Sequence, residues 1–103
     1  MKMKHINPEQ ALEIMKMRPE FQVLDVRTRR EFGVRRLACA MNIPVDELSR
    51  RYHELDEDAE IIVLCEHGLR SQRAALLLED AGFEKIYNVL GGLSRWKAQT
   101  VSG

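Results

Sequence analysis

The chain has 103 residues, of which 45% are hydrophobic, and its 16 basic side chains balance its 16 acidic ones. This length fits one domain over residues 1–103, and a formal net charge of zero lacks the positive field that nucleic-acid binding usually requires. Because no apolar run approaches the ~20 residues that span a bilayer and no apolar segment follows the basic start, we expect a cytoplasmic protein without a membrane or nucleic-acid partner.

Apolar runs alternate with helical patterns along the chain, which predicts an α/β fold with a largely parallel sheet. The first helix is predicted from Asn7 to about residue 17, because Asn7, Pro8 and Gln10 combine a side-chain cap, a proline at the first helical position and a capping-box partner. Residues 21–26 then form an apolar run that ends in a polar cluster, as expected of a strand.

The middle of the chain predicts a short helix, a short strand and a longer helical segment. Thr28 and Glu31 repeat the capping-box spacing directly after the first predicted strand. Residues 40–43 are typical of a strand, which Pro44 stops. Apolar residues then recur at helical spacing over residues 45–55.

The second half of the chain predicts two further strands with a helix between them. Residues 61–64 are apolar without alternation, which is the pattern of a strand covered by helices on both faces. An amphipathic helix follows, with its apolar stripe at Ala74, Leu77, Leu78 and Ala81. Residues 86–90 form the last predicted strand, and residues 93–96 begin a closing helix.

One of the two cysteines, Cys65, lies where chemistry is expected. It directly follows the buried strand, and a helix is predicted to begin near Ser71, so the loop between them lies at the carboxyl edge of the sheet. Gly68 allows successive backbone N–H groups to converge, and the helix N-terminus favours a thiolate. Arg70 adds a fixed positive charge. A cysteine in so polar a loop is interpreted as a nucleophile in an anion-binding cradle rather than as a small core residue.

The segment from Cys65 to Ser71 resembles the active-site loop of single-domain rhodaneses (thiosulfate sulfurtransferases), in which a catalytic Cys opens a short loop that contains Gly and closes on Arg-Ser. The resemblance covers nearly the whole chain. Its other parts, in chain order, are Asp25-Val26-Arg27, Glu31-Phe32, Asn42-Ile43-Pro44, Gly82-Phe83, Gly91-Gly92 and Trp96. The resemblance implies a three-layer α/β/α fold with a mostly parallel five-stranded sheet, in which residues 61–64 form the central strand.

The resemblance also implies an activity: sulfane sulfur passes from thiosulfate or a similar small anionic donor to a thiophilic acceptor, through a persulfide on Cys65. The acceptor is a small thiol or another protein. Asp25 and Arg27 would support the loop, and no metal or organic cofactor is expected. The residues expected to bind the substrate or the persulfide are Glu66, His67, Gly68, Leu69, Arg70 and Ser71.

Two other functions stay open. Phosphatases that share this fold resemble Cys-x5-Arg, whereas Cys65 and Arg70 form Cys-x4-Arg, and this tighter loop suits a single sulfur better than a phosphoryl group. The second alternative is a sulfur-relay or partner-binding module with little turnover of its own. In that case the basic stretch over residues 27–36 would be the docking surface, although charge runs are usually only solvated.

Three residues have more than one interpretation. Arg70 is expected to bind an anionic donor, with an ion pair to Asp25 or another carboxylate as the alternative. His67 is expected to face solvent rather than to act as a base. Cys39 is expected to be a small buried residue rather than a partner that resolves the persulfide, and the spacing of Cys39, Cys65 and His67 does not suggest zinc.

Overall fold

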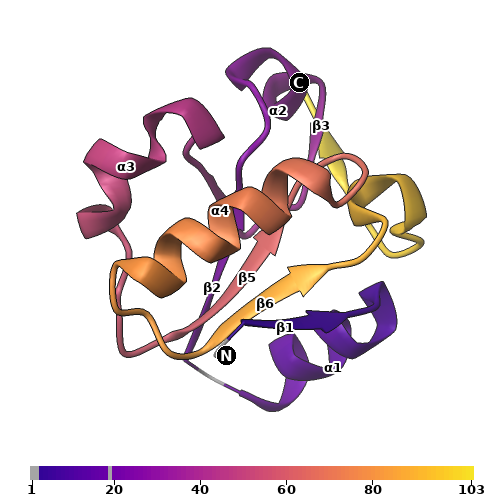
Figure 1. The fold of residues 1–103 in the computed structure, drawn as a ribbon. Coiled ribbons are helices and arrows are strands. Elements are labelled where there is room, and N and C mark those ends of the chain that lie inside the picture. Colours follow the sequence, from indigo (N-terminus) through magenta and orange to yellow (C-terminus); the bar gives the residue numbers. More distant parts are fainter. Residues whose placement is uncertain (1–2, 19) are drawn as a thin grey trace.

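The computed structural model describes residues 3–18 and 20–103. Its main feature is a five-stranded sheet in the order β1-β6-β5-β2-β4, in which every neighbouring pair is parallel (Figure 1). The strands are β1 (Met3–Ile6), β2 (Phe21–Asp25), β4 (Ala40–Asn42), β5 (Glu60–Leu64) and β6 (Ile86–Val89). The expected five-stranded sheet with residues 61–64 at its centre is therefore confirmed, and it is parallel throughout.

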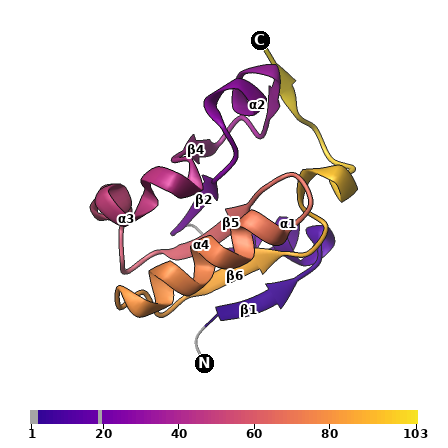
Figure 2. The same cartoon turned by 45° about the horizontal axis from the view of Figure 1, so that its top comes forward.

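Helices cover both faces of this sheet. They are α1 (Pro8–Met17), α2 (Arg29–Val34), α3 (Leu48–Arg51) and α4 (Leu69–Asp80). In Figures 1 and 2, α4 lies over one face of the sheet and α1 over the opposite face. The three-layer arrangement expected from the sequence is thus confirmed.

The central strand β5 shows why its sequence lacks alternation. Ile61 and Val63 pack into the core cluster that contains the buried residues of α3 and α4. Ile62 and Leu64 pack into the opposite cluster, with α1 and Trp96. All four side chains are almost inaccessible to solvent, because a parallel strand between two helical layers has no solvent-exposed face.

The caps of the first two helices form as predicted. At α1, the Asn7 side chain accepts a hydrogen bond from the Gln10 backbone N–H, and the Gln10 side chain accepts one from the Asn7 backbone N–H. Thr28 and Glu31 make the same reciprocal pair at the start of α2. These bonds satisfy backbone N–H groups that no helical carbonyl reaches, which fixes where each helix starts.

The structure differs from the sequence prediction at several elements. Strand β1 was not predicted, because its sequence MKHI has apolar residues only at its ends, and these are the two that the fold buries. A small antiparallel pair, β3 (Arg35–Arg36) with β7 (Val101–Ser102), was also missed. The segment over residues 45–54 is α3 between two 3-10 turns, η1 (Val45–Glu47) and η2 (Tyr52–Glu54). The predicted closing helix is a third 3-10 turn, η3 (Gly92–Arg95).

Helix α4 begins at Leu69, two residues earlier than predicted. Gly68 is its N-cap and has a left-handed backbone conformation, with φ of 94°, which a residue with a side chain rarely adopts. The loop between β5 and α4 is therefore shorter than expected, and Arg70 and Ser71 belong to the first helical turn. No helix in the described part of the chain is both long and apolar enough to cross a bilayer.

Candidate active site

Cys65 lies at the carboxyl end of β5, where the central strand meets the loop that leads into α4. Its side chain is buried, with 1% of the residue exposed. The back of the loop is fixed by the turn η3: the N–H groups of Leu93 and Ser94 donate to the carbonyl oxygens of Cys65 and Glu66, each at 2.9 Å. The start of the loop is thus held at the edge of the sheet by backbone hydrogen bonds from η3.

The Cys65 sulfur lies inside a small cradle of polar groups. The backbone N–H of Gly68 donates to Sγ at 3.0 Å, and that of Ser71 donates at 3.3 Å. The thiol in turn donates to the Ser71 hydroxyl oxygen at 3.3 Å. These N–H groups belong to the N-cap and the first turn of the 12-residue helix α4, whose partial positive charge favours a negative sulfur.

Some of the residues predicted to bind the sulfur do not point at it. Of the six, Gly68 and Ser71 contact Sγ directly. Leu69 is 75% exposed, and His67 is exposed on the surface, as expected of a residue that faces solvent. The Glu66 carboxylate instead accepts a hydrogen bond from Arg27 at 3.3 Å.

The two predicted supporting residues, Asp25 and Arg27, form a buried ion pair beside the loop. Arg27 Nη2 lies 2.8 Å from Asp25 Oδ2, and their side chains are 2% and 0% exposed. Arg27 also donates to the carbonyl oxygen of Arg35 at 2.6 Å. One guanidinium therefore contacts the end of β2, the loop after Cys65 and the chain after α2, so Arg27 holds these three segments together.

Arg70 forms an ion pair with Glu31 rather than with Asp25. Its two terminal nitrogens contact the two Glu31 oxygens at 2.7 and 2.9 Å. Arg70 and the Thr28 cap lower the pKa of Glu31 to about 2 from its ordinary value of 4.5. Of the two interpretations of Arg70, the structure shows the carboxylate contact, and the guanidinium is already neutralised.

This ion pair predicts a pH dependence of stability. Because the pKa of Glu31 is about 2 in the folded protein and near 4.5 when unfolded, the pair stabilises the fold above pH 4.5 and that contribution fades as the pH falls toward 2. The Glu31→Gln variant, which keeps a capping-box partner, is expected to lose about 1 kcal/mol or less near pH 7, since solvent screens a pair one-third exposed. Urea unfolding should show the difference between parent and variant shrinking near pH 3; a difference independent of pH would contradict the assignment.

Asn88 is a site residue that the sequence analysis did not single out. It is fully buried in β6, and its side-chain oxygen accepts the Ser71 hydroxyl proton. Its amide nitrogen lies 3.1 Å from Nδ1 of His5 on β1. Asn88 therefore orients the hydroxyl that contacts Cys65. The only signal in the sequence was a polar residue inside an apolar strand, which does not reveal its partner.

The Asn88→Leu variant is expected to slow sulfur loading of Cys65 by about tenfold, because Ser71 loses the acceptor that orients it. The double variant Ser71→Ala/Asn88→Leu should load no more slowly than Ser71→Ala, since the effect of Asn88 passes through Ser71. Single-turnover loading measured by mass spectrometry tests this. Additive losses would mean that Asn88 supports the fold rather than the hydroxyl.

The prediction that Cys39 is a buried residue is wrong. Cys39 is exposed, in the tight turn that the Ala40 N–H closes by donating to the Leu37 carbonyl at 3.1 Å. A residue at the tip of such a turn points away from the core, whatever its hydrophobicity. Cys39 and Cys65 are both free thiols. Within the described residues, no three His, Cys, Asp or Glu side chains are grouped as a metal site would require.

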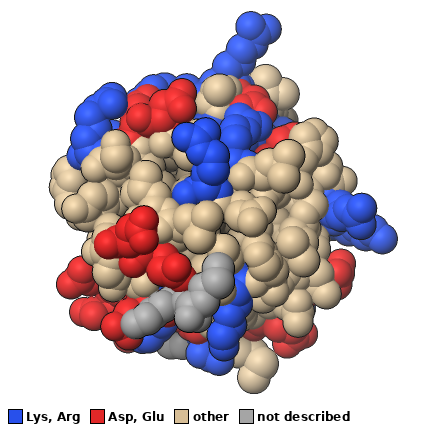
Figure 3. Space-filling model, viewed as in Figure 1, with Lys and Arg blue, Asp and Glu red and all other residues tan. Residues whose placement is uncertain are grey.

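The arginines between residues 27 and 36 mostly contact other parts of the same protein. Figure 3 shows basic side chains gathered over α2 and the start of α4, with carboxylates among them. Arg29 pairs with Glu47, and Arg36 lies over the Phe32 ring at 5.5 Å from its centroid. This stretch is therefore largely engaged within the fold, which weakens its interpretation as a free docking surface.

Comparisons with protein families and solved structures show which family the chain belongs to. The Rhodanese-like domain family model matches residues 7–99. The chain belongs to this family. Among solved structures, the rhodanese-related protein from Thermoplasma volcanium superposes with a TM-score of 0.87 at 32% identity, covering 97% of this chain and 99% of that one.

Curated relatives carry names that concern sulfur. A thiosulfate sulfurtransferase GlpE from Pseudomonas putida is 36% identical, over 92% of this chain and 86% of the relative. The GlpE of Coxiella burnetii is 31% identical, over 92% and 88%. The putative sulfur carrier protein YrkF of Bacillus subtilis is 34% identical, and this chain spans about half of it, 52%. The family and these relatives support sulfur transfer for this rhodanese-like chain.

Proposed function

We propose that this rhodanese-like protein is a sulfurtransferase that takes sulfane sulfur from thiosulfate, or a similar anionic donor, onto Cys65 and passes it to a thiophilic acceptor. The observation that carries the proposal is the Cys65 sulfur held by the Gly68 and Ser71 N–H groups at the start of α4. A negative sulfur gains most from such donors because they are already oriented before the reaction begins. The GlpE relatives are named for this activity.

The proposed reaction has two displacements. The Cys65 thiolate attacks the outer sulfur of thiosulfate; a bond forms between the two sulfurs, the S–S bond of thiosulfate breaks, and sulfite leaves with the electron pair. An acceptor nucleophile then attacks the outer sulfur of the persulfide, and the electron pair of the breaking bond returns to Cys65. The loop N–H groups stabilise the negative charge on the persulfide as an oxyanion hole stabilises oxygen.

The Arg70 contact favours sulfur over phosphate. A loop that surrounds a phosphoryl group needs a guanidinium directed at its oxygens. Here both terminal nitrogens of Arg70 bind the Glu31 carboxylate, and Glu66, the acid beside Cys65, contacts Arg27. Neither residue is placed to bind a phosphoryl group or to protonate its leaving oxygen.

The intact mass of the protein after thiosulfate treatment tests the proposal. We expect a gain of one sulfur atom, which cyanide removes as thiocyanate, and steady-state kinetics of the ping-pong type. No mass gain in a folded protein, or a sequential pattern with a ternary complex, would contradict it.

A sulfur-relay role is the second candidate, since one relative is named as a putative sulfur carrier. A relay protein would gain the sulfur from a donor but turn over slowly with cyanide until its partner is added. Comparing the extent of loading with the steady-state rate separates the two functions: efficient loading with fast turnover supports the free-standing enzyme, and efficient loading with slow turnover supports the relay.

A further inference from the structure

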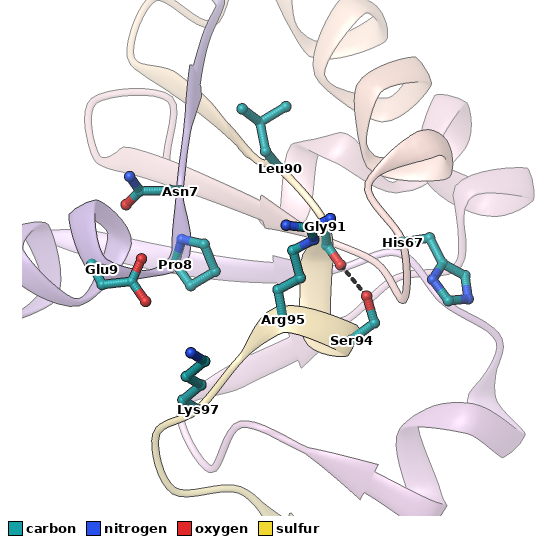
Figure 4. A pocket seen from close by; sticks show the side chains of 9 residues that line it. All are labelled: Asn7, Pro8, Glu9, His67, Leu90, Gly91, Ser94, Arg95 and Lys97. Atoms are coloured by element: carbon teal, nitrogen blue, oxygen red, sulfur yellow. Dashed lines mark hydrogen bonds between the residues drawn. The ribbon is translucent and has the colours of Figure 1, made fainter.

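A cleft of about 790 Å³ lies against the active-site loop (Figure 4). His67 borders it from the loop, Glu9 from the start of α1, and Arg95 and Lys97 from η3 and the residue after Trp96. Its volume falls in the range of small-molecule sites, about 300–1,000 Å³. The role proposed above for Cys65 makes no use of this cleft.

The cleft borders the loop that holds the Cys65 sulfur, through Gly91 and His67. The Gly68 N–H donates to Sγ, and a Cβ built on Gly68 would lie 3.0 Å from the Gly91 nitrogen, so the two glycines are in close contact. On the far side, a Cβ on Gly91 would lie 2.3 Å from Cδ of Arg95. The Arg95 side chain therefore lies flat on Gly91, which leaves no room for a side chain at that position.

The cleft contains two basic groups that no carboxylate in the described part of the chain neutralises, in contrast to the arginines that brace the loop. Arg27 and Arg70 are paired with Asp25 and Glu31. Within the described residues, by contrast, neither Arg95 nor Lys97 takes part in an ion pair or a side-chain hydrogen bond, and both are exposed. In Figure 4, the Arg95 side chain extends along Gly91, and Lys97 reaches toward the side of the cleft that carries Glu9.

We propose that this cleft binds the anionic part of a small thiol that accepts sulfur from Cys65, with Arg95 and Lys97 as the residues that recognise its carboxylates. This inference rests on the proposed sulfur transfer and adds the class of acceptor. Thiosulfate itself does not suit the cleft, because its oxygens lie only two bonds from the outer sulfur that Cys65 attacks and must stay close to the loop. A thiol whose charges are several bonds from its sulfur can reach the persulfide while its carboxylates remain in the cleft.

The step transfers one sulfur atom. The acceptor loses its thiol proton to solvent, and its thiolate attacks the outer sulfur of the Cys65 persulfide. A sulfur–sulfur bond forms on the acceptor as the bond to Cys65 Sγ breaks, and the electron pair returns to Sγ. The products are the Cys65 thiolate and an anionic persulfide of small size.

The test measures discharge of a persulfide that has first been formed to completion, so that the loading step does not enter. Thiosulfate is removed, and loss of the extra sulfur is followed by mass with the dianionic N-(3-mercaptopropanoyl)glutamate, whose carboxylates are remote from its thiol, the neutral 2-mercaptoethanol and the cationic cysteamine, compared at equal thiolate concentration. We expect the dianion to discharge the parent fastest. In the Arg95→Gln/Lys97→Gln variant its advantage over the neutral thiol should fall by about tenfold, as expected when two exposed ion pairs are lost.

Two further variants test whether the effect comes from charge within the cleft. Lys16→Gln/Arg50→Gln also removes one lysine and one arginine, at the far end of α1 and in α3, and should leave the order of thiols unchanged. Glu9→Gln removes the acidic group of the cleft and should increase the advantage of the dianion. Failure of the parent to load sulfur would refute the proposed function itself. Three results, each with normal sulfur loading, would overturn the cleft proposal alone. The parent could be discharged equally fast by all three thiols, or the double variant could lose discharge rate equally with all three. The third result is a preference seen only with an acidic cysteine peptide.

Discussion

Replacing Cys65 by alanine is expected to reduce sulfur transfer from thiosulfate to cyanide by about four orders of magnitude or more, because the bond that carries the sulfur can no longer form. The variant should keep the parent's fold, since alanine fills part of the same buried position and the loop is held by backbone bonds to η3. Steady-state assays and intact mass after thiosulfate treatment give the two readouts, and circular dichroism verifies folding.

Cys39→Ser is the matched control for this variant. Cys39 is an exposed free thiol in the turn before β4, so its substitution should leave loading and turnover near the parent values. Retained sulfur loading in Cys65→Ala, or loss of turnover in a folded Cys39→Ser protein, would show that the carrier has been assigned to the wrong cysteine.

Replacing Arg27 by methionine is expected to lower the free energy of unfolding by about 3–5 kcal/mol, the usual cost of leaving one partner of a buried ion pair alone. Asp25 is fully buried and would lose the guanidinium that contacts both of its oxygens. The Glu66 carboxylate and the Arg35 carbonyl would lose a donor as well. Urea denaturation near neutral pH measures the loss.

A second variant separates the buried charge from simple loss of packing. Asp25→Asn/Arg27→Met leaves no buried charge, and asparagine retains an oxygen for the Arg27 backbone N–H, which bonds Asp25 Oδ1 at 3.0 Å in the parent. The double variant should therefore recover a large part of the stability that the single variant loses. If both variants were equally unstable, the volume of the arginine rather than its charge would be responsible.

The sequence predicted the elements whose causes are local. Both capping boxes, at Asn7 with Gln10 and at Thr28 with Glu31, involve residues three positions apart, so one short window contains both partners. The uninterrupted apolar run in β5 likewise indicates burial on both faces without knowledge of what covers it. Strand β1 was missed because it is an edge strand of four residues whose middle pair, Lys4 and His5, is polar and exposed.

The site was predicted in part for the same reason. Cys65, Gly68 and Ser71 belong to one strand-loop-helix segment, and the positions of their backbone groups follow from where the strand ends and the helix begins. The sequence did not decide which carboxylate pairs with Arg70, because contacts between distant residues depend on how α2 packs against α4. The Arg70–Glu31 pair joins residues 39 positions apart, and nothing in the local pattern favours Glu31 over Asp25.

The sequence by itself thus determined the α/β class, the central strand and the position of a cysteine at a helix start, since each follows from periodicity or from neighbours within a few residues. Only the tertiary structure decided what surrounds that cysteine. Asn88 accepts a hydrogen bond from Ser71, Glu31 pairs with Arg70, and the Arg95 side chain packs on Gly91 beside the loop. These contacts arise because five parallel strands bring their carboxyl ends to one edge of the sheet, and strand order and register, which no short window of sequence contains, determine which side chains meet there.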